Sequence, residues 1–325
     1  MLEDSVVEVK NLIKIFKGGI RAVDGISFEV KEGEIFGILG PNGAGKSTAI
    51  KILTTLISMT SGEVSLLGLR RPEDDGKIRE IIGYLPQDIS SDSTLTGFEN
   101  MLLSARLHGL RGKKMVERIN SILHDLQLEN VKDRLPSTYS GGMIRKLELA
   151  QALVHMPKIM FMDEPTVGLD PAARISLWEQ IKQLRERQGV TIVMCTHNME
   201  EADSLCDRVA IMNRGKVAVT GAPSALKARA GKGSIIFELQ DETKVNIKRM
   251  RIKGKFVTIL SKTPEADLPR YLNLLVSKGM VVKSAAIKEV TLDDVFLKFT
   301  GGRITEDQTG WMGARRTRRI ARRLG

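Results

Sequence analysis

The sequence between positions 40 and 48 reads Gly40-Pro41-Asn42-Gly43-Ala44-Gly45-Lys46-Ser47-Thr48. It matches all four specified positions of G-x-x-x-x-G-K-[ST], the pattern of a loop that holds phosphate groups. The apolar run at 35–39 predicts a strand before this loop, and residues 47–56 predict a helix after it. A phosphate loop needs this order of strand, glycine loop and helix, which a chance glycine-rich turn would lack. The stretch therefore predicts an α/β fold with a phosphate-binding site.

The chemistry of phosphate binding explains each residue type in the loop. The glycines let backbone N–H groups converge on phosphates, and the following helix directs its positive end to the same place. We expect Lys46 to reach the β- and γ-phosphates of ATP, Ser47 to ligate Mg²⁺, and Thr48 to support the α-phosphate. The predicted ATP-binding loop comprises Gly40, Pro41, Asn42, Gly43, Ala44, Gly45, Lys46, Ser47 and Thr48.

A second motif places two carboxylates at the end of a buried strand. The apolar run at 159–162 leads into Asp163-Glu164-Pro165. A carboxylate at a strand end beside a phosphate loop can hold Mg²⁺ through water, which we assign to Asp163. Glu164 is then placed to orient or deprotonate the attacking water as general base. An isolated Asp-Glu pair is more often a solvated turn, but the strand before it and the loop upstream favour the catalytic interpretation.

A third motif is Tyr139-Ser140-Gly141-Gly142-Met143, which resembles the signature loop of ATP-binding-cassette (ABC) ATPases. With the phosphate loop before it in the chain and Asp163-Glu164-Pro165 after it, the motif makes residues 1 to about 225 resemble that family. The commoner form is Leu-Ser-Gly-Gly-Gln, so the chain departs from it at both ends and keeps the centre. That centre offers a hydroxyl and backbone amides at a helix start to a γ-phosphate. The resemblance implies that Ser140, Gly141 and Gly142 complete the ATP site of another subunit.

The resemblance assigns roles to four further residues. It implies that Phe16 stacks on adenine, where the family commonly has tyrosine, with core packing as the alternative for this ring. Gln87 matches the glutamine loop, which touches Mg²⁺ or water and faces the transmembrane partner. Asp170, in Gly168-Leu169-Asp170, matches the D-loop that crosses the dimer interface. His197 matches the switch histidine that contacts the γ-phosphate, after the strand expected at 190–194.

The family's architecture implies two ATP molecules held between two head-to-tail subunits, each touching Lys46 of one chain and Ser140 of the other. Both kinds of site look complete here, which favours a homodimer over a heterodimer with a similar ATPase. ATP binding would close the dimer, a membrane partner would move with it, and hydrolysis would reset both. The expected catalytic residues are Lys46, Gln87, Glu164 and His197, and the expected Mg²⁺ ligands are Ser47, Gln87 and Asp163.

Two segments narrow the resemblance within the family. Tyr-Ser-Gly-Gly-Met with the following residues 145–150, and the segment 291–297, look like exporters of the daunorubicin/doxorubicin-resistance type. This implies the ATP-hydrolysing subunit of an exporter for a drug or a lipid-like molecule, working with a separate multispan permease. The alternative is a soluble ABC ATPase acting on nucleic acid, ribosomes or a scaffold, although such proteins often carry two cassettes or a long coiled coil. A phosphate-loop kinase would leave Ser140 and His197 without a role.

The order of strand and helix patterns predicts the domain organisation. Residues 1–228 predict a P-loop NTPase core of the α/β class, with a mainly parallel sheet covered on both faces, an antiparallel β part and a helical subdomain at about 88–158. A small, polar segment at 228–233 is the expected linker. Residues 229–302 predict a small α+β domain for dimerisation or regulation. Residues 303–325 form a basic tail.

The charge and composition of the chain limit where in the cell the protein is expected to be. The net charge is +11, and the segment 311–325 holds six arginines and no acid. This tail is interpreted as a solvated arm or as a contact for anionic lipid headgroups, with nucleic acid least favoured. No apolar run approaches the roughly 18–20 residues of a membrane span, and no signal-peptide pattern begins the chain. We expect a cytoplasmic protein, peripheral on the inner face of the cell membrane, with Cys195 and Cys206 as buried structural residues rather than a disulfide or metal site.

Overall fold

The computed structural model describes residues 5–242 and 250–301 of the 325-residue chain. The contacts within these residues separate into two compact units, one ending at Pro223 and the other beginning at Ser224. All three motifs lie in the first unit. The basic tail expected at 303–325 lies outside the described residues.

The first unit is built on a six-stranded sheet. Its strands are β3 (Ile35–Leu39), β6 (Ile82–Leu85), β7 (Ile159–Asp163), β8 (Thr191–Thr196), β9 (Arg208–Asn213) and β10 (Lys216–Gly221). They follow the order β10-β9-β3-β8-β7-β6 and run parallel, except that β10 pairs antiparallel with β9 as a hairpin. Every residue of β3, β7 and β8 is buried, so both faces of the sheet are covered and the prediction of a mainly parallel sheet is confirmed.

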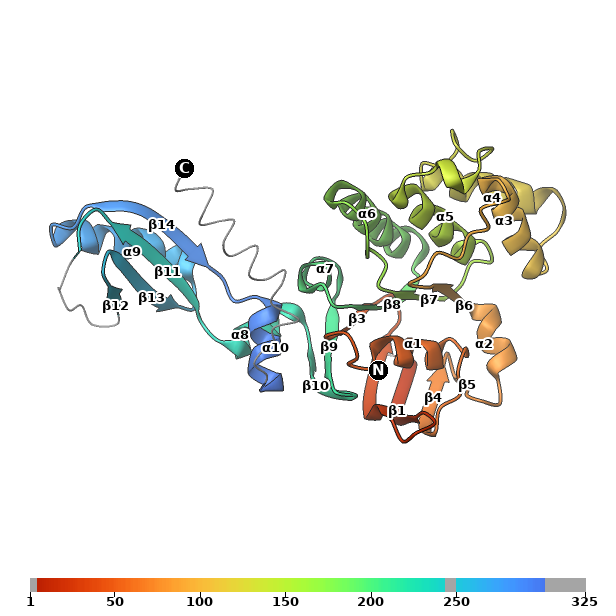
Figure 1. Ribbon diagram of the computed structural model, residues 1–325, viewed down its shortest axis with the longest axis horizontal. Coiled ribbons are helices and arrows are strands. Elements are labelled where there is room, and N and C mark those ends of the chain that lie inside the picture. The colour runs from red at the N-terminus through yellow and green to blue at the C-terminus, as the bar shows by residue number, and fades with distance from the viewer. Residues whose placement is uncertain (1–4, 243–249, 302–325) are drawn as a thin grey trace. The chain divides into compact units, whose positions relative to one another are not determined.

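A second, antiparallel sheet covers one side of the first. Its strands are β1 (Ser5–Ile15), β2 (Arg21–Lys31), β4 (Ser61–Leu66) and β5 (Leu69–Arg70), in the order β2-β1-β4-β5. Helix α1 (Lys46–Leu53) buries Ile50 and Leu53 in an apolar core that it shares with both sheets. The helix ends before the predicted residue 56, because Thr54 caps it and Thr55 has a φ of +65°. Figure 1 shows α1 and this antiparallel sheet on one side of the six-stranded sheet.

Helices cover the opposite side of the six-stranded sheet, where Figure 1 shows α5 (Gly141–Leu153) and α6 (Pro171–Gln188). The predicted helical subdomain is present. It consists of α3 (Gly97–Leu107), α4 (Gly112–Asp125), α5 and the short helix η1 (Pro136–Thr138). In α4, Met115, Ile119 and Leu123 are buried at the helical spacing that the sequence shows.

Two short helices complete the first unit. Helix α2 (Asp75–Ile81) precedes β6 and buries only Ile78, which explains why no apolar pattern predicted it. Helix α7 (Met199–Leu205) starts at the side-chain cap of Asn198 and ends at Leu205. Cys206 is the residue that caps its end. Both cysteines are buried and free, as predicted.

In the described residues, the second unit is an antiparallel sheet with three helices. Its elements are α8 (Pro223–Ala230), β11 (Gly233–Leu239), β12 (Met250–Lys253), β13 (Phe256–Ser261), α9 (Pro264–Ser277), β14 (Val282–Lys288) and α10 (Leu292–Thr300), with the strands in the order β12-β13-β11-β14. Strand β12 is short and was not predicted. The expected linker is helical up to Ala230, and Lys298 Nζ donates to the carbonyl of Arg229 at 2.6 Å. This contact joins α8 to α10.

Candidate functional site

The phosphate loop connects β3 to α1, in the order that the sequence predicts. Gly45 has a φ of +100°, and a Cβ added there would lie 2.2 Å from the carbonyl oxygen of Ala22. A Cβ on Gly40 would lie 2.3 Å from the carbonyl oxygen of Met212. Only glycine fits both positions, so the loop can pass close to its neighbours. No side chain caps α1, and its first backbone N–H groups are therefore available to an anion.

Lys46 lies inside this loop with its charge buried. Its Nζ donates to the carbonyl oxygens of Gly40 at 2.9 Å and Pro41 at 3.2 Å. It also lies 3.3 Å from Glu164 Oε1, and both side chains are 5% exposed. A buried ammonium held by carbonyls and one carboxylate is placed to exchange these partners for phosphate oxygens.

Glu164 links Lys46 to His197. The residue follows β7 and has a φ of +49°, the left-handed region that a side chain other than glycine seldom adopts. Its Oε2 lies 2.8 Å from His197 Nδ1 and accepts the backbone N–H of His197 at 3.3 Å. Because β7 and β8 are parallel neighbours, their carboxyl ends bring the two residues together. The structure thus unites Lys46, Glu164 and His197, which are 151 positions apart at most in the sequence.

Ser47 and Asp163 form a second contact beside this cluster. Ser47 Oγ donates to Asp163 Oδ1 at 2.9 Å, and Cys195 Sγ donates to the same oxygen at 2.7 Å. Burial, followed by the nearby Asp163 carboxylate, raises the pKa of the Cys195 thiol, so the thiol keeps its proton and remains a donor. A hydroxyl and a carboxylate at this spacing are the hard oxygen donors that Mg²⁺ prefers. The sequence did not predict the contact of Cys195 with Asp163.

The residues expected to act on another subunit's ATP cap helices in their own chain. Ser140 Oγ accepts the N–H of Met143 at 3.3 Å at the start of α5. Asp170 accepts the N–H groups of Ala172 and Ala173, each at 3.0 Å, at the start of α6. A Cβ on Gly142 would lie 2.9 Å from the Cβ of Ala173, so the two helix starts are side by side. Neither cap contacts the phosphate loop of its own chain among the described hydrogen bonds.

Phe16 and Gln87 lie on the surface. Phe16 is 41% exposed, with Lys14 Nζ 5.1 Å from the ring centroid, so the core-packing alternative is wrong. Gln87 is exposed just after β6. The preceding residue, Pro86, is tied to the core, because its carbonyl accepts from Arg145 Nη1 at 2.6 Å. The predicted ligand role of Gln87 therefore stays a prediction.

The third motif has tyrosine at position 139, where the commoner form has leucine, and the structure gives a reason for this difference. Tyr139 is buried, and its hydroxyl donates to the carbonyl of Val131 at 2.6 Å. A Cβ on Gly97 would lie 2.3 Å from the same hydroxyl. The tyrosine thus joins the segment before α5 to the start of α3, and it does not enter the Lys46 cluster.

The Glu164–His197 pair predicts a measurable titration. The hydrogen bond that His197 donates to the Glu164 carboxylate raises the pKa of His197 above its ordinary 6.5, against the opposing effect of burial. Burial acts to raise the pKa of Glu164, but the His197 hydrogen bond and Lys46 prevail, and its pKa lies below 4.5. The pair's contribution to stability is therefore complete between about pH 4.5 and 6.5 and is lost as pH rises through the raised pKa of His197. It stays below about 1 kcal/mol, since His197 is 39% exposed.

An NMR titration of the histidine side chains, without nucleotide, checks this prediction. The His197 signal, assigned with a His197→Ala variant, should titrate above pH 6.5 and should move to lower pH in Glu164→Gln. The signals of His108 and His155, whose pKa values are lowered by burial, serve as internal references. An identical His197 pKa in both proteins would contradict the pairing.

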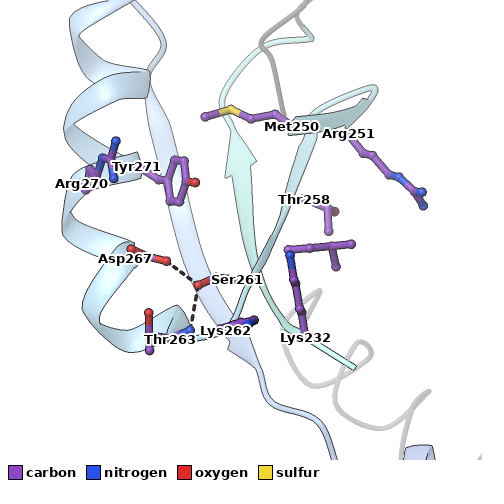
Figure 2. Close-up of a pocket in the computed structure, with 11 residues that line it drawn as sticks. Lys232, Met250, Arg251, Thr258, Ser261, Lys262, Thr263, Asp267, Arg270 and Tyr271 are labelled. Atoms are coloured by element: carbon purple, nitrogen blue, oxygen red, sulfur yellow. Dashed lines mark hydrogen bonds between the residues drawn. The ribbon is translucent and has the colours of Figure 1, made fainter. Parts of the chain in front are cut away.

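The second unit contains a hollow of about 650 Å³, shown in Figure 2. Ser261 Oγ donates to Asp267 and accepts the N–H of Thr263 at 3.0 Å, which joins β13 to α9. Arg251 and Arg270 lie on opposite sides of the hollow. These basic groups do not converge, and the side chains that line this hollow do not form a catalytic cluster.

The chain is similar in sequence and in fold to known proteins. Residues 23–167 match the family model described as ABC transporter. The chain is 35% identical to the daunorubicin/doxorubicin resistance ATP-binding protein DrrA of Streptomyces peucetius over 91% of this chain and 92% of that protein. It is 36% identical to the Nod factor export ATP-binding protein I of Burkholderia lata, over 91% and 97%. A dimeric structure of the ATP-binding cassette MJ0796 bound to ADP and Pi matches with a TM-score of 0.61 at 30% identity, over 66% of this chain and 98% of that one.

The chain therefore belongs to the ABC transporter family, as an ATP-binding subunit that hydrolyses ATP. The resemblance to the daunorubicin/doxorubicin-resistance type is confirmed, and the relatives do not favour a soluble ABC ATPase. Within residues 5–242 and 250–301, no helix is long and apolar enough to cross a membrane.

Proposed function

We propose that the chain powers export of a drug-like or lipid-like molecule through a separate multispan membrane protein. The cluster of Lys46, Glu164 and His197 carries the proposal, since it places a phosphate-binding cation beside a buried general base. The names of the relatives support the substrate class, because DrrA is a daunorubicin/doxorubicin resistance ATP-binding protein and the Burkholderia relative is a Nod factor export ATP-binding protein.

The contacts support an order of events at the site. Lys46 exchanges the loop carbonyls and Glu164 for the β- and γ-phosphates of ATP. Glu164, ionised at neutral pH because its pKa is lowered, is then free to accept a proton from the attacking water. His197 holds the Glu164 carboxylate and reaches the γ-phosphate. Ser47, Asp163 and Gln87 would hold Mg²⁺, which when bound neutralises phosphate charge.

A dimer completes this proposal. Ser140 and Asp170 stand at neighbouring helix starts, and both are exposed. Helix starts attract phosphate, and these two are free to meet the ATP of a second copy of the chain. Two ATP molecules would then lie between the two subunits and hold them together, and hydrolysis of the ATP would remove this contact.

Exposed apolar side chains of this chain offer a surface to the proposed membrane partner. Ile89 follows the exposed Gln87, and Leu103 and Leu107 lie on α3; they are 69%, 44% and 79% exposed. Exposed apolar side chains just after the glutamine loop and on α3 support protein contacts at these positions.

A pull-down tests the partner. Tagged Glu164→Gln protein, held in ATP and purified from detergent-solubilised native membranes, should retain a polytopic membrane protein in stoichiometric amount. Lys46→Met protein, which cannot form the ATP-bound state, is the control and should retain less. Recovery of ribosomes or nucleic acid in place of a membrane protein would contradict the export proposal.

A further inference from the structure

A buried ion pair on α5 contacts both the turn that presents Glu164 and the segment that carries Gln87. Arg145 and Glu148, one helical turn apart, have side chains that are only 8% and 1% exposed, and Arg145 Nη1 lies 3.0 Å from Glu148 Oε2. A buried charge pair is costly unless its remaining hydrogen bonds are satisfied. The hydrogen bonds that the pair makes to other segments therefore identify the segments whose positions it fixes.

Arg145 holds the turn that presents Glu164. Its Nε donates to the carbonyl of Pro165 at 2.8 Å, and its Nη2 donates to those of Asp163 at 3.2 Å and Glu164 at 3.4 Å. Glu164 is the residue of this turn with a positive φ, and such a conformation persists only where surrounding contacts enforce it. One planar guanidinium, with five N–H donors in a fixed fork, holds three consecutive carbonyls.

The same pair holds both ends of the glutamine loop. Arg145 Nη1 donates to the carbonyl of Pro86 at 2.6 Å. Glu148 Oε1 accepts the backbone N–H of Ser90, and the Ser90 hydroxyl at 3.2 Å. Gln87 lies between these two anchors. The start of α5, which carries Ser140, is thereby connected to the loop of Gln87 and to the turn of Glu164.

We propose that Arg145, with Glu148, is a positioning residue for ATP hydrolysis that makes the start of α5, the glutamine loop and the Glu164 turn shift together. The proposal rests on the catalytic role of Glu164 stated above. Among the described hydrogen bonds Arg145 makes none to the phosphate loop; it acts through the backbone of Asp163, Glu164 and Pro165. Its loss should therefore slow hydrolysis without weakening the contact of the phosphate loop with ATP.

The test uses Arg145→Lys, which keeps the charge and loses the fork, and Glu148→Gln. The matched control is Glu117→Gln, which breaks the exposed pair of Lys113 and Glu117 on α4, with an N–O distance of 3.7 Å. Measured on the full-length chain, kcat should fall about 10-fold or more in Arg145→Lys, because small misplacements of catalytic groups are costly. KM for ATP should stay within about twofold, since Lys46 and its loop are unchanged.

Hydrogen exchange gives a readout that does not depend on activity. Amides of 86–92 and 163–168 should exchange faster in both variants than in the unaltered chain, and those of 40–48 should not change. A raised KM with unchanged kcat, or unchanged exchange at both segments, would overturn the proposal. If Glu164→Gln abolishes hydrolysis while the Arg145 variant behaves as the unaltered chain, only this inference fails.

A measurement on the unaltered protein covers the case in which Arg145→Lys does not fold. On addition of ADP, exchange at 86–92, 141–148 and 163–168 should change in the same direction at the same nucleotide concentration. Independent responses of the three segments would overturn the proposal.

Discussion

Glu164→Gln should bind ATP but hydrolyse it at least about 100-fold more slowly than the unaltered chain, the range expected for loss of a general base. Glutamine keeps the shape of the side chain and can still contact Lys46 and His197, but it cannot accept the proton of water. Steady-state phosphate release gives the rate, and titration with ATP gives the affinity, which should change little. Glu186→Gln, on the exposed side of α6, is the control.

The same variant should accumulate as an ATP-stabilised dimer. If ATP joins two subunits through Lys46 of one and Ser140 of the other, blocking hydrolysis prolongs that state. Light scattering on the protein as it elutes from a size-exclusion column should report twice the monomer mass with ATP and a smaller mass without ATP. Undiminished phosphate release by Glu164→Gln would remove the catalytic assignment, whereas a monomer at saturating ATP would remove only the proposed ATP-bridged dimer.

The sequence predicts the parts of the site that depend on local chemistry. The loop 40–48 requires glycines and a lysine at set positions, and the apolar runs at 35–39 and 159–162 are buried strands by composition alone. Parallel order then places Glu164 and His197 at neighbouring strand ends. Three residues from separate segments could therefore be assigned before their contact was known.

Other parts of the site depend on tertiary contacts that no local pattern encodes. Arg145 and Glu148 have the spacing of an ordinary surface pair, which is usually solvated. Their burial follows from carbonyls of 86 and 163–165, segments that meet only in the folded chain. Cys195 was expected to be an apolar filler, and its thiol donates to Asp163 because β7 and β8 pair in register there. Neither the charge pattern of the sequence nor the positions of its cysteines predict the contacts of Arg145 with the carbonyls or of Cys195 with Asp163.

The burial of Lys46 makes its replacement the most severe change to nucleotide binding. Lys46→Met removes the ammonium that we propose to meet two phosphates, and two charge-assisted hydrogen bonds of about 1.5 kcal/mol or more each correspond to at least about 100-fold weaker ATP binding. It also leaves the buried Glu164 carboxylate with His197 as its remaining charged partner. Breaking a buried pair costs about 3–5 kcal/mol when nothing compensates, and His197 should reduce that cost, so a lower unfolding temperature without nucleotide is expected as well.

Lys51→Met provides the matched control for this prediction, because Lys51 is exposed on the same helix. Calorimetric titration with ATP should give the affinity of the unaltered chain for Lys51→Met and no measurable binding for Lys46→Met. Combining Lys46→Met with Glu164→Gln should restore part of the lost unfolding temperature, since the buried carboxylate that has lost Lys46 is then gone, but it should not restore ATP binding. Full affinity in Lys46→Met would mean that the backbone amides of the loop suffice to hold the phosphates, and Lys46 would then serve only to keep Glu164 ionised.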